Sequence, residues 1–82
     1  MIKACFEKQP KATGGGYGKW EGDTLCIFID PRDNPQKQLL TALHEVLDGH
    51  LNGQVRHGRL DMIAIDIVDV LQQLGLVRSD CK

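Results

Sequence analysis

The chain has no excess of charge of one sign and no long apolar run. Ten basic residues stand against eleven acidic ones, giving a net charge of −1 without a block of either sign. Nothing in this balance attracts phosphates or an anionic membrane, so we expect neither nucleic acid nor a membrane as partner. No apolar stretch approaches the roughly 20 residues that span a bilayer, and the N-terminus lacks the apolar core of a signal peptide. We therefore expect a cytoplasmic protein.

Cysteines are also few, and their number is odd. Cys5, Cys26 and Cys81 are widely separated along the chain. A disulfide framework favours an even count, and a structural zinc site favours Cys-x-x-Cys pairs. We expect reduced thiols, with Cys5 and Cys26 packed as small hydrophobic residues inside strands.

The chain is long enough for one domain, residues 1–82, and too short for a second core. Its first part predicts strands. Apolar and polar residues alternate over about residues 1–8, which is typical of a strand. Residues 16–30 predict a β-hairpin that turns at Gly22-Asp23, because a second alternating run follows the turn signal.

The second part predicts two helices. Asn34 is a good N-cap before Pro35, so a helix is expected over 35–51, with Gly49 or Gly53 ending it. After a polar loop, an apolar stripe of period 3.6 predicts a helix over 59–74.

Gly75 is the natural stop of this second helix, and residues 77–82 are expected to form a loose tail. The order strand, hairpin, helix, helix predicts an α+β fold. We expect a small antiparallel sheet, made of the N-terminal strand and the hairpin, with two α-helices packed on one face.

One segment of the first helix suggests chemistry: His44-Glu45-Val46-Leu47-Asp48. His44 falls at the edge of the apolar helix face, and Asp48, four residues on, lies directly above it. Such a pair at the rim of a core lets two side chains bind one metal ion while an intervening Glu holds a water molecule. Glu45 is the intervening residue that would hold the water molecule.

The surrounding sequence resembles a known family. Asp30 closes a strand, and Gln38-Leu39-Leu40-Thr41-Ala42-Leu43-His44-Glu45-Val46-Leu47 follows. This is similar to the approach to the active-site helix of minimal zincin-type metallopeptidases, most of all short phage-type and bacterial ones. In that family, an I-x-I-D strand ending precedes a T-L-x-H-E-x-x-H helix, and a later helix offers an acidic third ligand. The likeness covers roughly residues 16 to 76, and its specific part is the His-Glu core.

The resemblance implies a zinc ion held by His44, Asp48 and Asp66, with Glu45 as the general base that takes a proton from the bound water. Asp48 stands where the family has its second histidine. Two carboxylate ligands would neutralise the ion and make its water less acidic, which weakens hydrolysis. One histidine and two carboxylates also suit manganese or iron.

Each of these residues has a simpler interpretation. His44 suits a hydrogen-bonded residue at the border of the apolar face, and Asp48 suits a polar residue near a helix end. Asp66 suits a solvated helix face, an interpretation that the nearby Asp61 and Asp69 favour.

Two other histidines are alternative ligands. His57 falls in the expected loop, and His50 falls on the far side of the apolar stripe from His44, where it cannot easily share an ion. Both are also explained as structural or exposed residues.

Two functions follow. The first is a small zinc-dependent metallopeptidase-like protein with a degenerate HExxD motif. The alternative is a catalytically inactive zincin-like protein-interaction module, phage-encoded or regulatory, that needs no metal. In both cases the partner is a peptide or protein. It would bind at the hairpin edge, where an extended peptide adds a strand, or at the side of the second helix that carries Met62 and Ile65.

Overall fold

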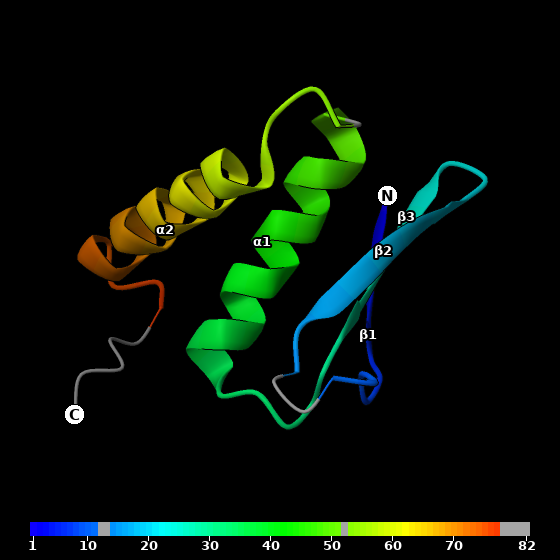
Figure 1. Cartoon of the computed structure of the whole chain (residues 1–82). Helices are drawn as coiled ribbons and strands as arrows, with labels where there is room; N and C mark the ends of the chain where they lie inside the picture. Colours follow the sequence, from blue (N-terminus) through cyan, green and yellow to red (C-terminus); the bar gives the residue numbers. More distant parts are fainter. Residues whose placement is uncertain (12–13, 52, 78–82) are drawn as a thin grey trace.

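The computed structural model describes residues 1–11, 14–51 and 53–77 and contains three strands and two helices (Figure 1). The elements are β1 (Ile2–Phe6), β2 (Gly16–Glu21), β3 (Thr24–Ile29), α1 (Pro35–Leu51) and α2 (His57–Gln73). The predicted α+β class is confirmed. Neither helix in the described ranges is long and apolar enough to cross a membrane.

The sheet has the strand order β1-β3-β2. β2 pairs antiparallel with β3 through the turn at Gly22, which has a φ of 64°, as the hairpin predicts. β1 pairs parallel with β3, so the sheet is mixed. Phe6 and Gly16 both pair with Ile29, so β1 ends and β2 begins at the same end of β3.

Helix α1 covers β2 and β3. The core consists of Leu25, Ile27 and Ile29 of β3, with Ala42 and Val46 of α1 packed against them. The alternation of side chains along β3 places Leu25, Ile27 and Ile29 on one face of the sheet. Ala42 and Val46 are four residues apart, so they lie on the same side of α1 and face these three residues.

The ends of α1 follow local signals. The side-chain oxygen of Asn34 accepts a hydrogen bond of 2.8 Å from the backbone N–H of Lys37, which confirms the predicted N-cap. The helix continues through Gly49 to Leu51, so Gly49 is not its end; Gly53 follows with a φ of 79°.

Helix α2 packs on α1, on the side away from the sheet (Figure 1). Its buried residues are Leu60, Ala64 and Val68. The fold therefore has three layers, sheet, α1 and α2, whereas both helices were expected on the sheet. Gly75 follows α2 with a φ of 74°, as predicted. Of the expected tail, residues 78–82 lie outside the described residues, and so does Cys81.

An ion pair between the buried Asp30 and the partly exposed Arg32 holds the end of β3 and the connector together. The Asp30 carboxylate is completely buried and accepts hydrogen bonds from the Arg32 side chain and from the backbone N–H of Gln9. Arg32 also donates to the carbonyl oxygens of Gln9 and Lys11. Hydrogen bonding to Arg32 holds the pKa of Asp30 well below its usual range. The strand end that leads into α1 is thereby fixed.

Candidate functional site

Four side chains join α1 to the beginning of α2. Nδ1 of His44 lies 2.7 Å from Oδ1 of Asp61, and Nε2 of His44 lies 3.1 Å from Nδ1 of His57. Nε2 of His57 lies 4.0 Å from Oδ1 of Asp48, at the outer limit of an ion pair. The order Asp61, His44, His57, Asp48 defines what we call the His44–His57 network.

Helical spacing produces this network. His44 and Asp48 are four residues apart on α1, and His57 and Asp61 are four residues apart on α2, so each pair shares one helix face. Leu60 is completely buried, and its packing sets the beginning of α2 against α1. The side chain of His44 is only 16% exposed, whereas that of His57 is 71% exposed.

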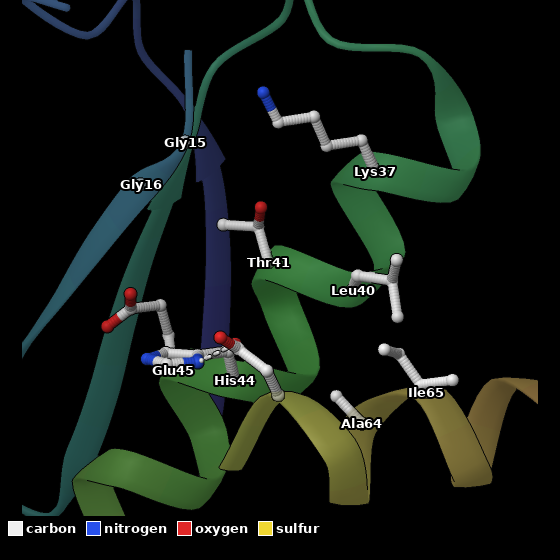
Figure 2. Close-up of a pocket in the computed structure, with 10 residues that line it drawn as sticks. Gly15, Gly16, Lys37, Leu40, Thr41, His44, Glu45, Ala64 and Ile65 are labelled. Carbon is white, nitrogen blue, oxygen red and sulfur yellow. Dashed lines mark hydrogen bonds and ion pairs between the residues drawn. The ribbon is translucent and has the colours of Figure 1, made fainter. Parts of the chain in front are cut away.

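A cavity of about 430 Å³ opens beside His44 (Figure 2). It lies between the beginning of β2 and the facing sides of α1 and α2. Its walls are mainly apolar, and its lining residues are Gly15, Gly16, Lys37, Leu40, Thr41, His44, Glu45, Asp61, Ala64 and Ile65. Figure 2 shows Leu40 of α1 opposite Ile65 of α2, with His44 and Glu45 further along α1 from Lys37. An apolar opening with a few convergent polar groups is the usual form of a small ligand site.

Glu45 lies at the sheet side of this cavity. Burial raises the pKa of its half-buried carboxyl; the neighbouring His44 acts to lower it, and Asp48 to raise it. Its Oε1 lies 3.5 Å from the position that a Cβ on Gly18 would take, so the carboxylate sits against the middle of β2. A partly desolvated carboxylate in an opening is typical of a general base.

The ligand set implied by the resemblance is only partly brought together. The ring of His57 contacts both His44 and Asp48. Asp66 is exposed and lines a different opening, with Ile63, Ile67, Val70 and Leu71. In the described part of the chain, no three or more His, Cys, Asp or Glu side chains are grouped so as to hold a metal ion. His44, Asp48 and Asp66 as arranged therefore do not fit one zinc ion.

The other two histidines have different surroundings. The ring of His50 lies edge-on to Trp20, with centroids 5.6 Å apart, and the Trp20 indole N–H lies 3.4 Å from the carbonyl oxygen of Gly49. His57 is the first residue of α2 rather than part of a loop, and it is the direct partner of His44.

Sequence reasoning gave Asp61 no role at the site, although it contacts His44 directly. The signal that identifies it is the four-residue spacing of His57 and Asp61, which repeats that of His44 and Asp48.

Comparison of the chain with protein-family models, with curated proteins and with solved structures found no significant match. The likeness to minimal zincin-type peptidases therefore stays a prediction from the quoted residues. The described residues contain two neighbouring histidines, His44 and His57, each with an aspartate nearby. They lie beside a mainly apolar cavity that the half-buried Glu45 also lines.

Proposed function

We propose that this domain is a small zincin-like hydrolase of peptide bonds, with its reaction centre where Glu45 and His44 meet the cavity. The observation that carries the proposal is the position of Glu45. Its carboxylate is half-buried in a mainly apolar opening, next to a histidine whose ring is fixed by Asp61. A carboxylate with little water around it accepts a proton readily, which suits a general base.

The adjacent strand supports a peptide as substrate. Among the residues that the structure describes, β2 pairs only with β3, so it lies at one edge of the sheet in the order β1-β3-β2. Its outer backbone groups are open to an added strand, the common way in which an extended peptide binds to a sheet. Gly18 leaves room above the middle of β2, where the Glu45 carboxylate lies. A peptide bound along this edge would pass Glu45.

The chemistry assigned to the chain is proton transfer. Glu45 takes a proton from a water molecule that attacks the peptide carbonyl carbon, and then delivers it to the departing amine. Asp61 holds the His44 ring in one orientation beside it. A bound divalent metal would polarise the carbonyl and acidify the water. The predicted ligand set is not assembled among the residues that the structure describes.

Peptide hydrolysis by the purified protein, with and without added zinc, tests this proposal. We expect cleavage of a fluorogenic peptide library and a loss of roughly 100-fold or more in Glu45→Gln, the usual contribution of a general base. Glu21→Gln is the matched control, because Glu21 is an exposed carboxylate at the other end of β2. An inactive wild type, or equal rates in wild type and Glu45→Gln, would contradict the proposal.

A second candidate is an interaction module that uses the outer face of α2. Ile63, Ile67, Val70 and Leu71 line a shallow apolar opening of about 330 Å³ there, next to Asp66. Between Leu60 and Gln73 the helix has three Asp residues and no Lys or Arg. An apolar face with an acidic border suits a basic amphipathic helix.

Fluorescence anisotropy with a labelled Leu/Lys amphipathic peptide separates this second function from the first. Binding that is lost in Val70→Asp and kept in Glu45→Gln would support the module. Equal binding by wild type and Val70→Asp would count against it, since Val70 lines the opening and is more than half exposed.

A further inference from the structure

We infer that the chain binds a divalent transition-metal ion between Nε2 of His44 and Nδ1 of His57, a site different from the ligand set that the resemblance implies. These nitrogens come from different helices and face each other at 3.1 Å. Two nitrogens on one tetrahedral zinc ion, each about 2.0–2.1 Å from the metal, lie roughly 3.3–3.4 Å apart. The observed separation is therefore a few tenths of an ångström shorter than that distance.

The outer side of the His44 ring carries the second feature of a metal-binding histidine. Such a histidine usually donates its remaining N–H to a carboxylate, which fixes its tautomer and orientation. Nδ1 of His44 lies 2.7 Å from Asp61, and Nε2 of His57 lies 4.0 Å from Asp48. The His44 ring thus has a carboxylate at hydrogen-bond distance on its outer nitrogen, whereas the Asp48 carboxylate lies near the outer nitrogen of His57 beyond hydrogen-bond distance.

A metal ion can take the place of the hydrogen between the two facing nitrogens. Without an ion, one of the two facing nitrogens must donate to the other, while both outer nitrogens face carboxylates that only accept. The two hydrogen bonds use one ring N–H each, from Nδ1 of His44 to Asp61 and from Nδ1 of His57 to Nε2 of His44. A metal ion in place of the central hydrogen leaves both rings neutral, with lone pairs inward and N–H groups outward. The charges of Asp48 and Asp61 then offset that of the ion.

The site is reachable from solvent. The side chain of His57 is 71% exposed, so an ion can enter from that side, and water can complete the coordination. Imidazole ligands suit zinc, copper, iron and nickel. The inference deepens the proposed function, since Glu45 neighbours His44, and it partly rests on that function for its biological meaning. Metal binding itself is measured without any hydrolysis.

Calorimetric titration with zinc chloride alone tests the site. The parent protein should carry Cys5→Ser and Cys81→Ser, so that zinc binding by these thiols does not contribute. We expect one zinc ion per chain, at least tenfold weaker binding in His57→Ala and in His44→Ala, and a roughly 10- to 100-fold loss in Asp61→Asn. His50→Ala is the matched control, because His50 lies against Trp20 and should leave binding unchanged.

His57→Ala should keep the fold, which circular dichroism checks, because that side chain is mostly exposed. Unchanged affinity in folded His57→Ala, or no binding by the parent at millimolar zinc, would overturn the inference. Zinc binding that depends on His57 in a protein without peptidase activity would refute only the proposed function. If hydrolysis is lost in Glu45→Gln while zinc affinity is unchanged in His57→Ala, only the metal site would be refuted.

Discussion

Replacement of Gly49 by alanine probes how closely α1 approaches β3. A Cβ at this position would lie 2.7 Å from Cδ2 and 3.1 Å from Cδ1 of Leu25. Leu25 is 1% exposed and packs in the core with Ile27 and Ile29, so its side chain has little room to turn away. Either the helix or the leucine must shift.

Two opposing terms decide the size of the effect. Alanine is favoured over glycine inside a helix by about 0.8–1.0 kcal/mol. Overpacking a well-filled core costs about 1–3 kcal/mol. We therefore expect Gly49→Ala to lower the free energy of unfolding by up to about 2 kcal/mol. In a domain of this size, each 1 kcal/mol corresponds to roughly 4–8 °C in Tm.

Gly58→Ala is the matched control for this substitution. Gly58 is the second residue of α2, its φ is not in the left-handed region, and an added Cβ would meet nothing within 4 Å. We expect it to leave stability unchanged or raise it by up to about 1 kcal/mol. Urea unfolding followed by circular dichroism and by the fluorescence of Trp20 measures both variants. If Gly49→Ala were as stable as Gly58→Ala, the close contact with Leu25 would not be the reason for glycine in α1.

Two further substitutions address the packing of α2 and the ion pair of Asp30 with Arg32. Leu60→Ala removes a completely buried side chain between α2 and α1 and should lower the free energy of unfolding by about 2–5 kcal/mol; a loss below about 1 kcal/mol in urea titration would mean that α2 is only loosely attached. Asp30→Asn should destabilise the domain at pH 7, because the lowered pKa of Asp30 contributes stability above the ordinary carboxyl pKa of about 4. That contribution falls once the pH drops below this ordinary value of about 4, and it is lost as the pH passes through the much lower folded-state pKa, so the difference from wild type should begin to shrink below about pH 4. A difference that stays constant as the pH falls further would argue against the role of Arg32.

Local signals predicted most of the fold. The alternation of Leu25, Ile27 and Ile29 and the cap at Asn34 act over a few residues, and the structure has both. The direction of β1 was not predictable in this way, because alternation is the same in parallel and antiparallel strands. The beginning of α2 was missed because its N-cap, Arg56, makes no side-chain capping hydrogen bond and so gives no sequence signal.

The site was predicted only in part for a related reason. His44 and Glu45 stand out through a local motif, whereas the acidic partner on α2 depends on which face of that helix meets α1. Asp61 and Asp66 are five positions apart, which corresponds to a rotation of about 140° around a helix. The packing of Leu60 and Ala64 turns Asp61 toward His44 and leaves Asp66 exposed. Tertiary packing therefore determines which aspartate of α2 lies next to His44, and the sequence of the helix alone does not show it.

Under the proposed zincin-like function, Asp48 is the carboxylate that lies beside the ring of His57. In the family pattern the first helix provides both histidines and the later helix an acid; here each helix provides one histidine and one aspartate. If the histidine and the aspartate at positions 57 and 48 are interchangeable, exchanging them should restore zinc binding. His57→Asp alone should weaken zinc binding at least tenfold, and adding Asp48→His should restore it to within tenfold of the parent, because two imidazoles then lie one turn apart on α1. Titration with zinc measures both variants. A double variant as weak as His57→Asp would show that α1 does not hold a zincin-type ligand pair, and the resemblance to that family would lose its physical basis.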